Sequence, residues 1–242
     1  MISKKLYSLQ FKTTENFNNN LLHLLSLIQK CSNDSIILAP EVCLSGFCYD
    51  RMDEACEVSK KAKDRLKNES IGKSIGLTMI EKEEDGYYNN FYMFSGGEII
   101  HKQAKAKLFK LGQEHQYFKE GRVEDIKPFI VDGLKIGVLI CFELRFINLW
   151  QRLNGCDVIL VPAMWGRPRK HNYETLTNAL AITLQSFVIA SDSTNDDMAS
   201  SSGIITPFGK DLRHDTKEII SHFADFSEVD KVRKYIDISE HE

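Results

Sequence analysis

Apolar residues near the start of the chain repeat with two different periods. Tyr7, Leu9 and Phe11 alternate with polar neighbours, which predicts a strand with one buried face. An apolar stripe at helical spacing follows and predicts a helix that packs one face on the core. The stripe consists of Phe17, Leu21, Leu24, Leu25 and Ile28. Thr13 or Thr14 stands where a residue that caps the helix is expected.

The apolar run at residues 35–38 predicts a second strand. Because a helix joins it to the first strand, the two strands should be parallel. Pro40 has no backbone N–H to donate and ends the strand. Glu41 should therefore project from the carboxyl end of the strand, at the edge where open α/β sheets bind ligands.

A longer helix and three antiparallel strands are predicted next. Residues 53–68 combine Lys, Glu and Ala with apolar residues at helical spacing, so we expect a helix with a solvated charged face. The three strand candidates are residues 75–81, 87–94 and 98–104. Asp-Gly and Gly-Gly pairs separate them, and both pairs are typical of tight hairpin turns.

The second half of the chain repeats the strand-helix-strand pattern. Residues 129–131 and 135–140 predict a hairpin, residues 146–153 a helix, and residues 157–161 a strand parallel to the one before it. A basic loop at residues 165–171 follows. The later elements are a helix at 173–184, strands at 187–190, 203–206 and 218–223, a turn at 207–210 and a short closing helix. We expect an α/β chain that folds as one domain over residues 1–242.

Charge and hydropathy indicate which kinds of molecule the protein binds. The 31 basic and 34 acidic residues are interleaved and give a net charge of −3, so nucleic acid and anionic lipid are not expected partners. No run approaches the ~20 apolar residues of a membrane helix, and the amino terminus lacks the apolar region of a secretion signal. We therefore expect a cytoplasmic protein that acts on a small molecule without contact with a membrane.

The cysteines and histidines predict neither disulfides nor a metal site. The six cysteines form no Cys-x-x-Cys pair, and the seven histidines lack zinc-site spacing. Without a secretion signal, reduced thiols are expected. Cys141 stands apart because it follows the apolar run 136–140 and precedes Glu143 and Arg145. A buried cysteine is more often inert than reactive, so this position alone does not establish a catalytic site.

Three stretches together carry a family resemblance. They are Ala39-Pro40-Glu41, the Lys-Ala-Lys-Leu-Phe run at 105–109, and the Leu-Ile-Cys-Phe-Glu-Leu-Arg-Phe run at 139–146. In this order they resemble the nitrilase superfamily of carbon-nitrogen hydrolases, whose site contains a glutamate, a lysine and a cysteine. Residue by residue, these fall on Glu41, Lys105 and Cys141.

Further segments extend the resemblance over nearly the whole chain. Residues 157–163, with Trp165, match what the family places after the cysteine strand, and Glu114 matches a glutamate that supports the lysine. Leu144-Arg145-Phe146 and residues 112–121 are most similar to the omega-amidase branch, which hydrolyses side-chain amides of short keto acids. The resemblance implies a four-layer α-β-β-α sandwich, an amidase that needs no cofactor, and a homodimer or higher homo-oligomer.

The chemistry of these residues agrees with the resemblance. A thiol of ordinary pKa ~8.5 is mostly protonated at neutral pH, and a nearby carboxylate base or ammonium makes it a useful nucleophile. Glu41 would take the thiol proton and return it to ammonia. Lys105 and the backbone N–H of Phe142 would stabilise the oxyanion, and water would hydrolyse the thioester.

Substrate binding is assigned to cations near the cysteine. The parallel strands should bring the loop at 165–171 to the same edge as Cys141. The cations Arg167, Arg169 and Lys170 are therefore expected to hold a substrate carboxylate, and Trp165 is expected to contact the substrate. Arg145 is a competing clamp. An ion pair between Glu143 and Arg145 at the helix start fits the sequence equally well.

Two other functions remain open at this point. The same triad would serve an N-carbamoyl amine hydrolase or a nitrilase. A catalytically silent, nitrilase-like binding protein is the alternative of another class. Its support is Thr183-Leu184, which stands where the family typically has Glu-Asn.

Overall fold

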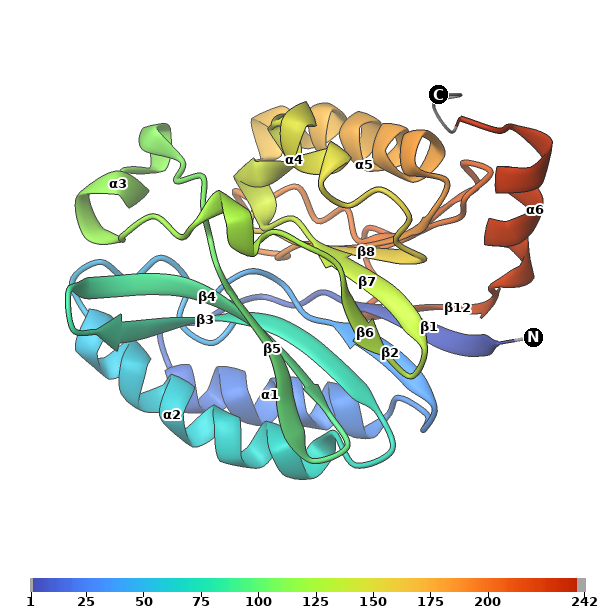
Figure 1. Cartoon of the computed structure of the whole chain (residues 1–242). Coiled ribbons are helices and arrows are strands. Elements are labelled where there is room, and N and C mark those ends of the chain that lie inside the picture. Colours follow the sequence, from blue (N-terminus) through green and yellow to red (C-terminus); the bar gives the residue numbers. More distant parts are fainter. Residues whose placement is uncertain (1, 239–242) are drawn as a thin grey trace.

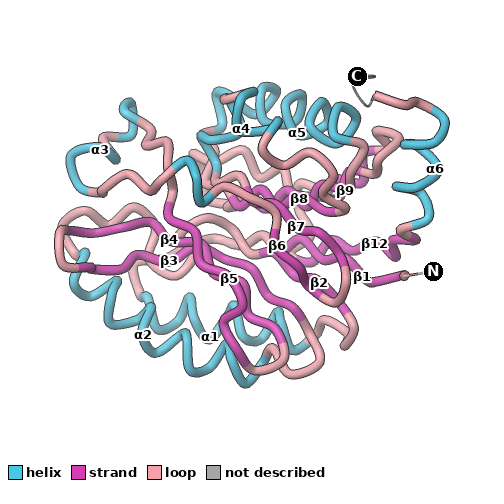
Figure 2. The backbone as a smooth tube through the Cα atoms, viewed as in Figure 1, coloured by secondary structure: helices cyan, strands magenta, loops and turns pink. Residues whose placement is uncertain are grey.

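The computed structural model describes residues 2–238 and contains two six-stranded sheets that face each other. Helices cover both outer faces, which gives the order helix, sheet, sheet, helix seen in Figure 1 and, by element type, in Figure 2. The predicted α-β-β-α sandwich is confirmed. The single domain was predicted over residues 1–242, of which residues 1 and 239–242 lie outside the described part.

The first sheet is mixed. It consists of β1 (Ser3–Leu9), β2 (Ser35–Leu38), β3 (Ser74–Glu83), β4 (Gly86–Ser95), β5 (Glu98–Ala104) and β12 (Ile219–Asp225), in the order β12-β1-β2-β3-β4-β5. Strand β2 is parallel to β1 and to β3, and β3, β4 and β5 form the predicted antiparallel meander. Helices α1 (Phe17–Gln29) and α2 (Met52–Glu69) cover its outer face.

The second sheet carries the second strand-helix-strand unit. It consists of β6 (Phe129–Val131), β7 (Leu134–Val138), β8 (Val158–Pro162), β9 (Phe187–Ser191), β10 (Gly203–Ile205) and β11 (Asp211–Arg213), in the order β11-β10-β9-β8-β7-β6. As predicted, β7 and β8 are parallel. Helices α4 (Ile147–Gln151) and α5 (Lys170–Leu184) cover its outer face.

Short helices complete the structure. Helix α3 (Glu114–Tyr117) lies beyond the sheets at the left of Figure 1, and α6 (Ser227–Tyr235) follows β12 at the right. The 3-10 turns are Lys110–Gly112, Val123–Asp125, Cys141–Arg145 and Arg167–Arg169. Among residues 2–238, no helix has the length and apolar character needed to cross a membrane.

Residues 6–9 of β1 and all of β2 are buried on both faces of the first sheet. Leu6 and Ile36 belong to the apolar cluster that fills the space between the sheets, whereas Tyr7 and Ile37 pack in a second cluster with α1 and α2. The prediction that the first strand has one buried face is therefore wrong. The hydroxyl of Ser8, also buried, donates to the carbonyl oxygen of Ala190 at 2.6 Å and links the two sheets.

Local details differ from the sequence prediction at three other points. Asn16, and neither predicted threonine, caps α1 by accepting the N–H of Asn19 at 3.0 Å. Strand β7 ends at Val138 because the N–H of Ile140 donates to a side-chain carboxylate and is lost to the ladder. Strand β11 was missed because Asp-Leu-Arg is short and has no apolar alternation.

Candidate active site

The candidate site lies where three strands end. Glu41 follows β2 across Ala39-Pro40, Lys105 directly follows β5, and Cys141 follows β7 at the start of a 3-10 turn. The structure brings these three sequence-predicted residues together. Their exposed fractions are 0%, 1% and 7%, respectively, so the cluster is buried and only Cys141 retains a small opening to solvent.

Lys105 sits between two carboxylates. Its Nζ lies 2.7 Å from Glu41 Oε1 and 2.7 Å from Glu114 Oε1. Burial disfavours the ammonium, but Glu41 and Glu114 hold the pKa of Lys105 above its ordinary value. Burial raises the pKa of Glu114, and Glu41 adds to the rise because the two carboxylates share one ammonium. Glu114 therefore occupies the supporting position next to Lys105 that the resemblance implied.

The Glu41 carboxylate is held from both sides. Asn89 donates its side-chain amide to Oε1 at 2.8 Å, and the backbone N–H of Met164 donates to Oε2 at 3.2 Å. The next residue, Val42, has a φ of 40° and donates its N–H to the hydroxyl of Thr78 at 2.7 Å. A β-branched residue at positive φ is strained, so this bond fixes the backbone at Glu41.

Asn89 and Thr78 are site residues that the sequence analysis missed. Asn89 is buried on β4, and its backbone carbonyl oxygen also accepts the backbone N–H of Lys105 at 2.9 Å. A signal was present, because Asn89-Asn90 interrupts a run of aromatic residues in a predicted strand and asparagine is disfavoured in strands. A buried polar residue in such a strand indicates a specific hydrogen-bonding role.

A glycine allows the loop after α3 to close on Lys105. The N–H of Gly121 donates to the carbonyl oxygen of Lys105 at 2.8 Å. A Cβ at this position would lie 2.3 Å from the carbonyl oxygen of Ala104, which is too close for any other residue. The loop therefore covers the end of β5, next to Lys105, whose side chain is shielded from solvent.

The backbone and the charge of Cys141 are both unusual. Its φ of 47° is in the left-handed region, a strained conformation for a residue with a side chain. Burial, and then the charge of Glu41, raise the pKa of the Cys141 thiol well above its ordinary value, against the influence of Lys105. A thiol whose pKa is raised in this way needs a base when it attacks.

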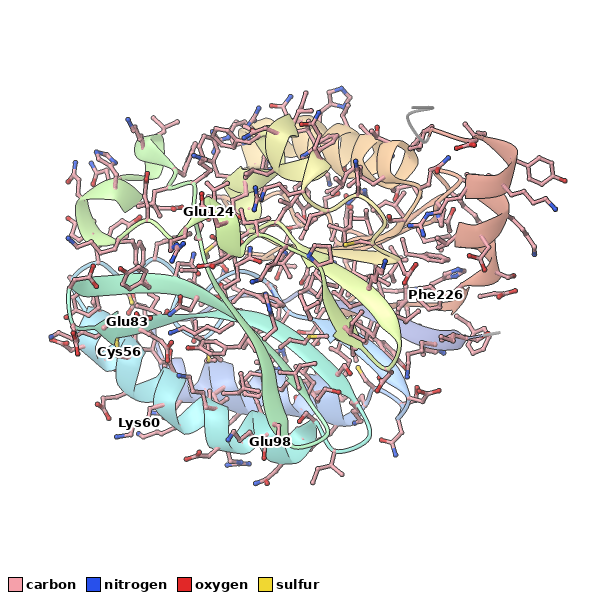
Figure 3. The ribbon with its side chains drawn as sticks, in the orientation of Figure 1. Cys56, Lys60, Glu83, Glu98, Glu124 and Phe226 are labelled. Carbon is pink, nitrogen blue, oxygen red and sulfur yellow. The ribbon has the colours of Figure 1, made fainter. Side chains whose placement is uncertain are left out.

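The other five cysteines are also free. Burial raises the pKa of Cys31 to about 11 and that of Cys43 and Cys156 to about 12. Cys48 and Cys56 are half-buried. Figure 3 labels Cys56 on helix α2, on the outer side of the first sheet.

Glu143 does not pair with Arg145, so that interpretation is wrong. The Glu143 carboxylate is fully buried and accepts the N–H of Ala106 at 2.6 Å and the N–H of Ile140 at 2.7 Å. Burial raises its pKa to about 7, although these two N–H groups oppose the rise. Arg145 instead donates to the side-chain oxygen of Asn172 at 3.2 Å.

A cavity of about 210 Å³ opens above Cys141. Aromatic and cationic side chains dominate its lining. They are Phe47, Tyr49, Phe109, Phe142, Trp165, Arg145 and Arg169, and Glu114, Met164 and Met198 also reach it. Phe142 is the second residue of the 3-10 turn that Cys141 begins, and N–H groups in the first turn of a helix have no partner within the helix.

Two guanidinium groups in the cavity have no carboxylate partner among residues 2–238. Arg145 lies 5.0 Å from the Trp165 ring and Arg169 lies 5.2 Å from the Phe109 ring. Arg167, the sequence-predicted binding residue, is exposed and lies outside the lining. Of the three cations expected from this loop, only Arg169 belongs to the lining of the cavity, because the 3-10 turn at 167–169 directs it there.

Asp192 anchors the cavity wall and was also missed. It is fully buried after β9 and accepts the backbone N–H of Trp165 at 2.7 Å. The carbonyl oxygen of Trp165 accepts the N–H of Ala199 at 2.7 Å, which attaches the segment that contains Met198. Burial raises the pKa of Asp192 to about 7, and the N–H groups that it accepts oppose the rise.

Within residues 2–238 no three His, Cys, Asp or Glu side chains are grouped so that they could hold a metal ion. The cluster of Glu41, Lys105, Glu114 and Cys141 is thus a set of proton donors and acceptors around a thiol, in a cavity lined by rings and guanidinium groups.

Comparisons with known proteins identify relatives. The family model described as carbon-nitrogen hydrolase matches residues 6–234. A 2-oxoglutaramate amidase from Bacillus subtilis (strain 168) is 30% identical over 217 residues, which cover 84% of this chain and 83% of that protein. Omega-amidase YafV from Escherichia coli (strain K12) is 29% identical over 203 residues, which cover 79% and 76%.

One solved structure illustrates the likeness of the fold. Nit3 of Saccharomyces cerevisiae, described as a member of branch 10 of the nitrilase superfamily, superposes with a TM-score of 0.86 at 21% identity. The alignment covers 98% of this chain and 96% of that one. The likeness therefore extends over both sheets and their helices.

Proposed function

Because the chain belongs to the carbon-nitrogen hydrolase family, we propose that it hydrolyses the amide bond of a small substrate that also carries a carboxylate. One observation carries this proposal. A buried thiol lies beside a Glu41–Lys105–Glu114 network, at a cavity whose two guanidinium groups have no carboxylate partner among residues 2–238. The similarity to a 2-oxoglutaramate amidase and to an omega-amidase supports the same substrate class.

The first half-reaction begins with the neutral thiol. As the Cys141 sulfur attacks the amide carbon, its proton passes to Glu41, and the negative charge moves to the amide oxygen. Lys105 and the backbone N–H of Phe142 stabilise this oxyanion. When the carbon-nitrogen bond breaks, Glu41 gives its proton to the leaving nitrogen, and ammonia departs from a thioester.

The second half-reaction returns the thiol. Glu41 takes a proton from water, whose oxygen attacks the thioester carbon, and Lys105 again meets the oxyanion. The carbon-sulfur bond then breaks, the proton returns from Glu41 to the Cys141 sulfur, and the carboxylic acid product leaves. Glu41 therefore needs its two fixed contacts, to Asn89 and Met164, because one carboxylate serves both half-reactions.

The cavity supports a short, anionic substrate. Its volume of about 210 Å³ is below the ~300–1,000 Å³ typical of sites for drug-sized ligands. Arginine suits the capture of a carboxylate because its planar guanidinium donates two parallel hydrogen bonds. Arg145 and Arg169 stack on rings of the cavity and have donors to spare, whereas Lys170, from the same loop, pairs with Asp215 and Glu174.

The silent-protein alternative has little support in the geometry. Thr183 is exposed and Leu184 is packed in the core at the end of α5, and neither lines the cavity. Their departure from the family pattern therefore leaves the contacts among Glu41, Lys105 and Glu114 intact. An N-carbamoyl amine or a nitrile would use the same groups, and the substrate comparison below separates them.

The test is ammonia release from a short free-acid monoamide, from its methyl ester, and from an N-carbamoyl amine and a nitrile of similar size. We expect the free acid to have the highest kcat/KM. Arg145→Met and Arg169→Met should each raise KM for the acid by at least ~10-fold, the loss expected for a charge-assisted hydrogen bond, with little effect on the ester.

Arg167→Met is the matched control, because Arg167 belongs to the same loop but lies outside the cavity lining. It should leave both substrates unaffected. Equal turnover of acid and ester would refute the carboxylate clamp and indicate a general amidase. Preference for the carbamoyl compound or the nitrile would reassign the substrate class within the same chemistry.

A further inference from the structure

Glu143 connects two of the segments that carry the proposed catalytic residues. Lys105 immediately precedes Ala106, and Ile140 immediately precedes Cys141. Each oxygen of the Glu143 carboxylate accepts one backbone N–H, from Ala106 at 2.6 Å and from Ile140 at 2.7 Å. A single side chain thus connects the segment after β5 of the first sheet with the segment after β7 of the second sheet.

The Glu143 carboxylate lacks the partners of an ordinary structural ion pair. It is 0% exposed, and no Lys or Arg side chain lies within ion-pair distance of it in the described part of the chain. The two hydrogen bonds from Ala106 and Ile140 offset part of the free-energy cost of removing this carboxylate from water. A buried carboxylate that accepts only backbone N–H groups constrains those segments, because either N–H would otherwise be left unpaired.

We propose that Glu143 is a positioning residue of the amidase reaction, whose carboxylate fixes the distance between the Lys105 ammonium and the Cys141 thiol. The inference rests on the proposed function of the same site. Glu143 touches neither the thiol nor the ammonium by any hydrogen bond. Glu143 determines how well the Lys105 ammonium is aligned with the oxyanion that forms at Cys141. Its loss should therefore lower kcat.

The charges around Glu143 make this connection sensitive to pH. Burial raises the pKa of Glu143 to about 7, the N–H groups of Ile140 and Ala106 and the charge of Lys105 oppose the rise, and Glu41 adds to it. Above this pH the carboxylate accepts both N–H groups. As pH falls through about 7, one oxygen becomes a hydroxyl and one bond is lost.

Glu143→Gln is the direct test. The amide keeps the size of the side chain but presents N–H donors to one of the two backbone N–H groups, so only one bond survives. We expect kcat to fall by at least ~10-fold, since a small misplacement of reacting groups is costly, while KM stays unchanged. The decline of kcat as pH falls through about 7 in the wild type should be absent.

Asp192→Asn is the matched control, because it also replaces a fully buried carboxylate that accepts backbone N–H groups and has a pKa of about 7. Asp192 holds the Trp165 wall, so this variant should change KM and keep the decline of kcat below pH 7. The inference would be overturned if Glu143→Gln had a wild-type kcat or changed only KM. It would also be overturned if kcat of that variant still declined as pH falls through about 7.

A second measurement needs neither a variant nor turnover. In the wild type, the amide protons of Ala106 and Ile140 should titrate together in NMR spectra with a midpoint near 7. Independent or absent titration would overturn the connection even if Glu143→Gln fails to fold. If the wild type hydrolyses no amide but the two protons do titrate together, the proposed function fails while the connection stands.

Discussion

Replacement of Lys105 by Met should lower kcat by ~10²–10³ and destabilise the protein in a pH-dependent manner. Met retains most of the side-chain length and removes the ammonium that lies 2.7 Å from both Glu41 and Glu114. All three side chains are buried, with exposed fractions of 0%, 0% and 4%. The change leaves two buried carboxylates without a cation.

The magnitude follows from this burial. Removal of one partner of a buried ion pair costs ~3–5 kcal/mol of folding free energy, and loss of one oxyanion donor costs ~10²–10³ in kcat. Burial and the charge of Glu41 already raise the pKa of Glu114, and loss of the ammonium removes the charge that opposes this rise, so the folded variant binds more protons than the unfolded chain. Its stability relative to the wild type should therefore increase as pH falls, by up to ~1.4 kcal/mol per pH unit for each proton.

Two assays check this reasoning. Ammonia release gives kcat, and denaturant unfolding at several values of pH gives the difference in stability between variant and wild type. Lys107→Ala is the control, because Lys107 is half-buried, its Nζ lies 5.6 Å from the Phe146 ring, and it takes no part in the ion pairs that Lys105 makes with Glu41 and Glu114. The Lys107→Ala change should lower the free energy of unfolding by no more than ~1 kcal/mol. A larger loss of turnover in Lys107→Ala, or a destabilisation of Lys105→Met that grows towards acid pH, would refute the assignment.

Two further predictions concern the thiol and the cavity wall. In Glu41→Gln, one charge that raises the pKa of Cys141 is gone while Lys105 remains, so iodoacetamide should alkylate Cys141 at lower pH than in the wild type. Amide turnover should be lost, because no group returns a proton to ammonia. Alkylation of Cys56, measured in the same samples, should not change, and a shift of Cys141 alkylation to higher pH would contradict the account. Asp192→Asn should raise KM more than it lowers kcat, because the Trp165 wall loses an anchor; a wild-type KM measured by initial rates would contradict that role.

Much of the architecture was predictable because hydrophobic periodicity is a local property. Residues 35–38 and 98–104 were predicted with the bounds that β2 and β5 have in the structure. Failures came where a side chain replaces a backbone partner. Asn16 caps α1 in place of a threonine, and Glu143 takes the N–H of Ile140 from the ladder. Such exchanges depend on residues brought together by the fold.

The residues of the candidate site likewise fall into those that the sequence indicated and those that it did not. Glu41, Lys105 and Cys141 were found because each belongs to a recognisable stretch at a strand end. Asn89 and Asp192 were not found, because each acts through a backbone or side-chain partner that is distant in sequence. The cytoplasmic location and the homodimer or higher oligomer stay predictions, since neither follows from the contacts within one chain.

Intact-mass spectrometry during turnover tests the central claim most directly. The protein is mixed with the monoamide of a short dicarboxylic acid and quenched in acid, and the modified peptide is then mapped. The account predicts an adduct with the mass of the acyl group on Cys141, together with ammonia release, and neither in Cys141→Ala. Undiminished ammonia release by Cys141→Ala, or an acyl adduct on any of the other five cysteines in place of Cys141, would contradict it.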